Sequence, residues 1–248
     1  MPRQPRIKSS SGIYHIMLRG INQQAIFEDE EDREKLIETL ATYKAISGYK
    51  IFAYCLMSNH IHLLLKVEKE DIEQIIKRVA GSYVYWYNRK YYRRGHLFQD
   101  RFKSEPVEDD TYFMTVLRYI HQNPIKAKIT KTMDEYKYSS YHDYAAADSE
   151  FVDIDFALAM ISHENLLKFN NEKNNDICLD CDKINFRLSD IDAKKIIQKV
   201  SKCQNITEFQ ALETIQRDKY IKKLRKKGLS IRQISRLTGV NFSIVRKL

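Results

Sequence analysis

The sequence has no long apolar run. None of its hydrophobic stretches reaches the roughly 18 residues that a transmembrane helix needs. The basic N-terminal segment MPRQPRIKSSSG also lacks the apolar core of a signal peptide. We therefore expect a cytoplasmic protein that has no membrane partner.

Cysteine is scarce as well. The 248 residues include only four cysteines, Cys55, Cys178, Cys181 and Cys203. They are too few and too scattered for the disulfide framework of a secreted protein. Two of them have CxxC spacing, but no second Cys/His pair with zinc-knuckle spacing follows. We expect reduced thiols.

Acidic residues are nearly missing from two segments of a chain whose net charge is +9. Residues 214–248 hold eleven Lys or Arg against one acid, and residues 76–103 hold eight against one. In the second segment the cations alternate with Tyr, Trp and Phe. Cations bind phosphates and aromatic rings stack on unpaired bases, so this pattern favours single-stranded nucleic acid as a partner.

The order of predicted elements indicates an α+β fold. The order β-α-β-β-α-β is typical of a ferredoxin-like antiparallel sheet with helices on one face, and it leaves the other face open. The hairpin between the second and third strands turns at Ser58 and Asn59. The predicted strands are 13–20, 48–57, 59–67 and 97–107, and the predicted helices are 29–46 and 70–92.

The third strand, in the segment SNHIHLLLK, carries two histidines. Side chains alternate along a strand, so His60 and His62 point to one face while the aliphatic side chains between and after them point to the other. We expect the aliphatic side chains under the helices and both imidazoles on the open face. A His-x-His pair alone does not define a metal site, so a third group is needed.

That third group lies in a further predicted helix, 109–129. Its apolar residues recur at helical spacing, Asp109 or Asp110 is placed to cap its start, and Pro124 is expected to end it. Tyr119 and Asn123 lie one turn apart and share a flank. Two imidazoles and an amide oxygen suit a divalent cation that polarises a phosphodiester, with the tyrosine as nucleophile and a phosphotyrosine as product.

Four motifs in order, YHIMLRG, AYCLMSNHIHLLL, GHLFQDRFKS and LRYIHQNPIKA, resemble the single-tyrosine transposases of the HUH superfamily, especially the REP-associated ones. The resemblance covers about residues 10–145. It implies the HUH endonuclease fold, His60, His62 and Asn123 as ligands of Mg²⁺ or Mn²⁺, and Tyr119 as the nucleophile. Ser58 departs from the family pattern, where proline is commoner. The implied activity is cutting and joining single-stranded DNA at hairpin-forming sequences.

The resemblance also implies that the segment GHLFQDRFKS lies near DNA. Together with the basic segments, it predicts the residues that contact single-stranded or hairpin DNA, and it implies a nucleoid-associated protein. The predicted contacts are Arg19, Arg93, Arg94, Arg101, Lys103, Arg232 and Arg246.

We expect three parts: a transposase domain at 1–147, an acidic linker or helical satellite at 148–213, and a basic DNA-binding segment at 214–248. In the last part, apolar residues recur at helical spacing on both sides of a turn at Gly239. This pattern predicts a helix-turn-helix, or alternatively a basic helical hairpin that packs on the main domain. Monomer and homodimer both stay open. The alternative function is a non-catalytic DNA-binding protein or repressor that keeps the fold.

Overall fold

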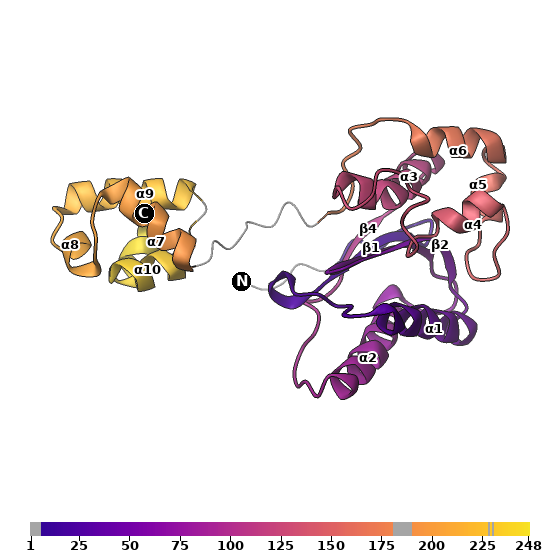
Figure 1. The fold of residues 1–248 in the computed structure, drawn as a ribbon, viewed down its shortest axis with the longest axis horizontal. Coiled ribbons are helices and arrows are strands. Elements are labelled where there is room, and N and C mark those ends of the chain that lie inside the picture. The colour runs from indigo at the N-terminus through magenta and orange to yellow at the C-terminus, as the bar shows by residue number, and fades with distance from the viewer. Residues whose placement is uncertain (1–5, 181–189, 228, 230) are drawn as a thin grey trace. The chain divides into compact units, whose positions relative to one another are not determined.

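The computed structural model describes residues 6–180, 190–227, 229 and 231–248. The chain divides into two compact units between Asp180 and Cys181 (Figure 1). In the described ranges, no helix combines the length and the apolar character needed to cross a membrane. Cys55, Cys178 and Cys203 are buried free thiols, and Cys181 lies outside the described residues.

The N-terminal unit is built on a four-stranded antiparallel sheet with strand order β2-β3-β1-β4. Helices α1 and α2 pack on one face of it (Figure 1). This arrangement confirms the ferredoxin-like fold. The elements are β1 (Ile13–Arg19), η1 (Ile21–Gln23), α1 (Glu30–Ser47), β2 (Lys50–Met57), β3 (His60–Lys66), α2 (Ile72–Lys90) and β4 (Lys103–Pro106).

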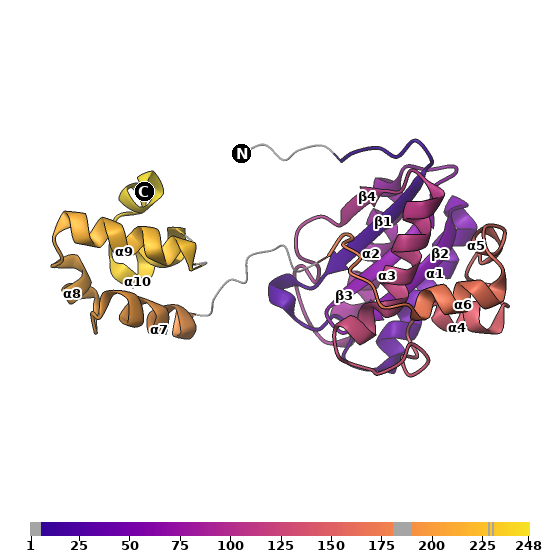
Figure 2. The ribbon, with the colours of Figure 1, turned by 90° about the horizontal axis from the view of Figure 1, so that it is seen from above.

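The second face of the sheet is covered by α3 (Asp110–Lys126), which lies across it on the side opposite α1 and α2 (Figures 1 and 2). The expectation of an open face is therefore wrong. The apolar stripe of α3 needs a surface to pack on, and Phe113, Val116 and Ile120 are fully buried. His62 is consequently fully buried in the interior.

The start and the end of α3 fix the helical geometry of the segment that carries Tyr119 and Asn123. The Asp109 carboxylate caps the helix by accepting a hydrogen bond of 2.7 Å from the backbone N–H of Tyr112. Contrary to the prediction, Pro124 does not end the helix but lies inside it. Proline removes one backbone N–H donor, and Pro124 lies in the last turn of α3, so the helix loses only one hydrogen bond near its end. The next turn is still closed, because the Ala127 N–H donates to the Asn123 carbonyl at 2.9 Å. Asn123 thus keeps helical geometry one turn after Tyr119.

Three short helices and a loop flank α3. The helices are α4 (Tyr141–Ala146), α5 (Asp155–Leu158) and α6 (His163–Asn171). After α6 the chain returns to α3, where the Arg118 guanidinium pairs with Glu172 at 3.1 Å and with Asp176 at 2.9 Å. Gln122 donates to the carbonyl of Glu172 at 2.9 Å. These interactions hold residues 172–180 beside the helix that carries Tyr119.

The C-terminal unit is helical and has its own core. Its helices are α7 (Asp190–Ser201), α8 (Ile206–Gln210), α9 (Thr214–Lys226), α10 (Ile231–Thr238) and α11 (Phe242–Lys247). The observed division differs from the predicted boundaries after 147 and after 213. The reason is that buried residues of α7 and α8, such as Ile197 and Phe209, pack in one cluster with Leu224 and Ile234 of the basic helices.

The turn between α10 and α11 contains Gly239, whose φ is 70°. This positive φ confirms the turn expected there. Arg246 is exposed on α11, and Arg232 lies in α10 with its side chain outside what the structure describes. DNA binding by this helix pair stays a prediction.

Candidate active site

Two buried histidines form the centre of the site. The register of the sheet places Met17 of β1 opposite His62 of β3, so His15, two residues earlier on β1, points to the same α3-covered face. The His15 Nε2 and His62 Nδ1 atoms are 2.9 Å apart, and both side chains are fully buried. Burial lowers the pKa of His15 to about 3 and the pKa of His62 well below its ordinary value, so both rings are neutral at neutral pH.

The remaining nitrogen of His62 points to a ligand site. His62 Nε2 is buried and has no hydrogen-bond partner among the described residues. If the His62 Nδ1–H donates to His15, Nε2 carries a lone pair and can bind a cation. The reverse arrangement would leave a buried N–H without an acceptor at His62 Nε2, just as this one leaves it at His15 Nδ1, so hydrogen bonding alone does not select between them. A cation at His62 Nε2 would select the arrangement in which His62 donates to His15.

His60 and Asn123 complete the donor set. His60 Nε2 lies 3.4 Å from the Asn123 Oδ1, and His60 Nδ1 lies 2.7 Å from the side-chain oxygen of Asn59. The rings of His60 and His62 are 5.1 Å apart between centroids. The structure thus brings together the two imidazoles and the amide that the sequence predicted as neighbours. Among the described residues, no three His, Cys, Asp or Glu side chains form a metal-binding group, so the third donor here would be an amide oxygen.

The donor atoms of His60, His62 and Asn123 suit a divalent cation. Neutral imidazole nitrogens and an amide oxygen are donors that Mn²⁺ accepts, and two protein nitrogens with one oxygen leave positions open for substrate. The unpartnered His62 Nε2 is the observation that favours a ligand at this point. The residues present therefore fit the predicted Mg²⁺ or Mn²⁺, and the metal stays a prediction.

Tyr119 lies against both histidines. Its ring centroid is 5.9 Å from that of His15 and 5.7 Å from that of His62, with edge-on geometry in both pairs. The Tyr119 hydroxyl donates a short hydrogen bond to the carboxylate of Asp180. The ammonium of Lys126 lies 4.7 Å from the Tyr119 ring centroid. Tyr119 is 3% exposed, so a phosphate reaches its hydroxyl only after a local movement of the residues that cover it.

The predicted DNA contacts of this unit fall into two groups. Arg19 and Arg101 line one pocket, and Arg101 and Lys103 line a second hollow beside it. Arg93 and Arg94 lie apart from these, directly after α2, where Arg93 donates to the side chain of Gln24 at 3.2 Å. DNA contact by all five residues stays a prediction.

The sequence reasoning missed His15 and Asp180. The signal for His15 was available, since the alternation in IYHIMLR sets its histidine apart from Ile16 and Leu18, which face α1 and α2. Asp180 gives no such signal, because it lies in an irregular acidic segment 61 residues after Tyr119. Only the return of the chain along α3 brings the two together.

The chain is similar to known proteins over part of its length. Residues 8–123 match the family model described as "Transposase IS200 like". Over 106 residues, which make up 38% of this chain and 60% of the relative, the chain is 28% identical to a protein of Haemophilus influenzae named "Putative REP-associated tyrosine transposase". The matched segment thus spans less than two thirds of that relative's length.

A solved structure shares the fold. It is a REP-associated tyrosine transposase bound to a REP hairpin, and it superposes with a TM-score of 0.53 over 62% of this chain and 90% of that chain, at 16% identity. This likeness supports the architecture of the N-terminal unit, and the family match covers both histidine strands and the helix of Tyr119. Residues 8–123 of this chain are therefore similar to the IS200-like transposase family, and the solved structure shares the fold of the N-terminal unit.

Proposed function

We propose that the protein is a metal-dependent, single-stranded DNA transposase that cleaves and rejoins DNA at hairpin-associated sites through a 5′-phosphotyrosine intermediate. The observation that carries the proposal is the position of Tyr119, which lies against His62 and His15 and donates its hydroxyl proton to Asp180. A hairpin as substrate is supported by the related structure, whose transposase is bound to a REP hairpin.

The residues suggest how the nucleophile acts. The Tyr119 oxygen forms a bond to phosphorus while the bond from phosphorus to the 3′ oxygen breaks, and the phenolic proton passes to the carboxylate of Asp180. The departing 3′ oxygen takes a proton from solvent and becomes a free 3′ hydroxyl. Because a tyrosine hydroxyl has an ordinary pKa of about 10, it needs such an acceptor at neutral pH. His60, His62 and Asn123 would hold the cation, which supplies electrophilic stabilisation of the phosphate charge. Rejoining reverses the step, so no external energy source is required.

The competing function is DNA binding without chemistry. Incubation of end-labelled single-stranded hairpins with Mn²⁺, followed by denaturing electrophoresis, separates the two functions. A transposase gives a DNA–protein adduct that survives denaturation. Salt-sensitive binding without an adduct would instead identify a non-catalytic DNA-binding protein or repressor.

We predict that His15→Leu weakens Mn²⁺ binding about 10- to 100-fold, because the acceptor that orients His62 is removed. Isothermal titration calorimetry measures this effect without DNA or turnover. His15→Gln should recover part of the affinity, since its amide oxygen can accept the His62 Nδ1–H. Equal, wild-type affinities in both variants would show that His15 only fills space.

The C-terminal unit allows a test of the division of labour. We predict that removing residues 181–248 weakens DNA binding and flattens its salt dependence, because eleven Lys or Arg lie in 214–248. For single strands, every phosphate that is no longer neutralised lowers the slope of log affinity against log salt by about 0.7. A cut after Asp180 follows the observed division, whereas a cut after 213 would leave α7 and α8 without their partners.

Cleavage by the truncated protein should survive at saturating DNA, since His60, His62, Tyr119 and Asn123 all lie in the remaining unit. The adduct assay and the salt titration are run on the same preparation, with a thermal melt as the folding control. If the truncated protein folds and binds Mn²⁺ but forms no adduct at saturating DNA, the C-terminal unit is part of the active complex.

A further inference from the structure

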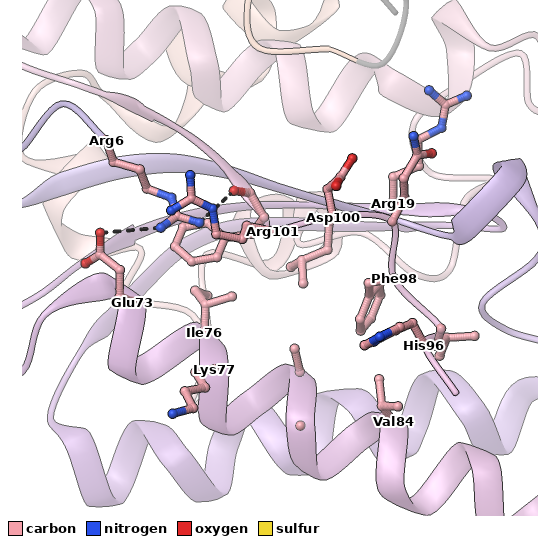
Figure 3. A pocket seen from close by; sticks show the side chains of 16 residues that line it. Arg6, Arg19, Glu73, Ile76, Lys77, Val84, His96, Phe98, Asp100 and Arg101 are labelled. Atoms are coloured by element: carbon pink, nitrogen blue, oxygen red, sulfur yellow. Dashed lines mark hydrogen bonds and ion pairs between the residues drawn. The ribbon is translucent and has the colours of Figure 1, made fainter. Parts of the chain in front are cut away.

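A pocket of about 540 Å³ lies between α2 and residues 96–102, on the face of the sheet opposite Tyr119. Figure 3 shows Ile76 and Val84 of α2 on one side of the pocket, and Phe98 and the Arg101 segment on the other. Its volume falls in the range of about 300–1,000 Å³ that is typical of small-molecule sites. None of the residues proposed for the cleavage chemistry lines it.

The pocket exists because the chain leaves the sheet before β4. A single bridge joins Phe98 to Gly20, and the Gln99 N–H donates to the Arg19 carbonyl at 2.7 Å. The backbone then takes a φ of 55° at Asp100, and regular pairing resumes only at Lys103. The predicted strand 97–107 is therefore interrupted, and its first half arches away from the sheet beside α2.

A glycine on α2 keeps the pocket open. Gly81 lies in the middle of the helix, where glycine is less favourable than alanine by about 1 kcal/mol. A Cβ at this position would meet no atom within 4 Å, so packing does not require glycine here. Gly81 lines the pocket, and any larger side chain there would extend into it.

The lining is suited to a flat, apolar ring attached to an anionic chain. The floor of the pocket is aliphatic, and Lys77 and Arg101 line it. Arg6 pairs with Glu73 at 3.5 Å, and the Arg19 and Asp100 side chains point away from α2 (Figure 3). The Arg6 guanidinium stacks 3.7 Å from the centroid of the Phe102 ring and donates to the Phe102 carbonyl at 3.0 Å. The Phe98 ring also borders the pocket (Figure 3). Rings stack on bases and cations attract phosphates, which together describe an unpaired nucleotide.

The pocket adjoins the candidate active site at one end of the sheet. Arg19, which lines the pocket, is the register partner of His60 on the neighbouring strand. DNA whose scissile phosphate lies at Tyr119 can therefore pass around this end of the sheet and place a nearby base on the other face.

We propose that this pocket binds one unpaired base from the single-stranded flank of the DNA hairpin. The proposal rests on the proposed function in that it takes single-stranded DNA as the substrate. It assigns the pocket a role in choosing where along the flank the strand is held, separate from the chemistry at Tyr119.

The test uses Gly81→Leu, which fills the pocket, and Gly81→Ala as its matched control. Both substitutions raise helix propensity, so both variants should melt at or above the wild-type temperature. The probes are hairpin oligonucleotides with unpaired flanks that carry 2-aminopurine at successive positions, and a blunt hairpin without flanks. Measurement without metal makes the readout independent of cleavage.

We expect 2-aminopurine fluorescence to be quenched at one flank position in the wild type and in Gly81→Ala, and not in Gly81→Leu. Gly81→Leu should also bind the flanked hairpin about tenfold more weakly, as expected for the loss of one stacked base, and bind the blunt hairpin normally. Phe98→Leu should lose the quenching as well. Tyr85→Leu, which removes a ring that is 71% exposed on α2 outside the pocket, should keep it.

Wild-type binding and quenching in Gly81→Leu would overturn the proposal, and would be the result if the pocket takes another class of molecule. The adduct assay on the same proteins separates this failure from failure of the proposed function. An adduct in the wild type with no effect of Gly81→Leu on flanked DNA rejects the pocket alone. Absence of any adduct in the wild type rejects the transposase chemistry, and the quenching pattern still decides the pocket.

Discussion

Tyr119→Phe should abolish the covalent attachment of DNA while leaving DNA affinity close to that of the wild type. The substitution removes one oxygen and no charge, so the surface presented to phosphates is unchanged. Loss of the nucleophile should lower adduct formation by at least about 10³-fold, since the hydroxyl that lies between His62 and Asp180 is the one removed. Denaturing gels measure the adduct, and filter binding or anisotropy measures affinity.

The same helix offers a matched control. Tyr112 is half-buried on α3, and its hydroxyl hydrogen-bonds to the Glu105 carboxylate, much as Tyr119 bonds to Asp180. Tyr112→Phe therefore removes a similarly hydrogen-bonded hydroxyl from the same helix but away from the two histidines, and it should cleave normally. In both variants the missing hydrogen bond should cost only about 0.5–1.5 kcal/mol of stability. An undiminished adduct in Tyr119→Phe would contradict the assignment of the nucleophile.

The parts of the site that could be predicted are those set by short-range periodicity. Alternation along one strand places His60 and His62 on one face, and the helical repeat places Tyr119 and Asn123 on one flank. Both patterns need only neighbouring residues, and both are present in the structure. The order of strands and helices likewise follows from local patterns and the limited set of ways to connect them.

The parts that could not be predicted depend on long-range register and on segments without a repeat. His15 meets His62 only because β1 pairs with β3 so that Met17 lies opposite His62. Asp180 reaches Tyr119 because Arg118 and Gln122 hold the preceding loop along α3. The rule that proline ends a helix failed at Pro124, since one missing donor in the last turn does not outweigh the burial of α3 on the sheet.

His62→Ala should remove Mn²⁺ binding and adduct formation together. His62 Nε2 is buried without a partner among the described residues, and His62 Nδ1 bonds to His15, so the ring is oriented but its second nitrogen is unused by the fold. Removing one of three protein ligands should lower Mn²⁺ affinity by at least about 100-fold, a larger effect than that of the supporting His15. Calorimetry measures the affinity before any DNA is added.

Because His62 is fully buried, its removal also leaves a cavity and an unpaired His15, and the variant must be shown to fold by a thermal melt. His60→Ala provides a second test, since His60 is only half-buried and its removal disturbs little packing. His142→Ala, at an exposed histidine of α4, controls for weak binding of Mn²⁺ to any imidazole. If folded His60→Ala and His62→Ala both bind Mn²⁺ as the wild type does, the metal site lies elsewhere, and the orientation of His62 by His15 serves the packing of α3 on the sheet instead.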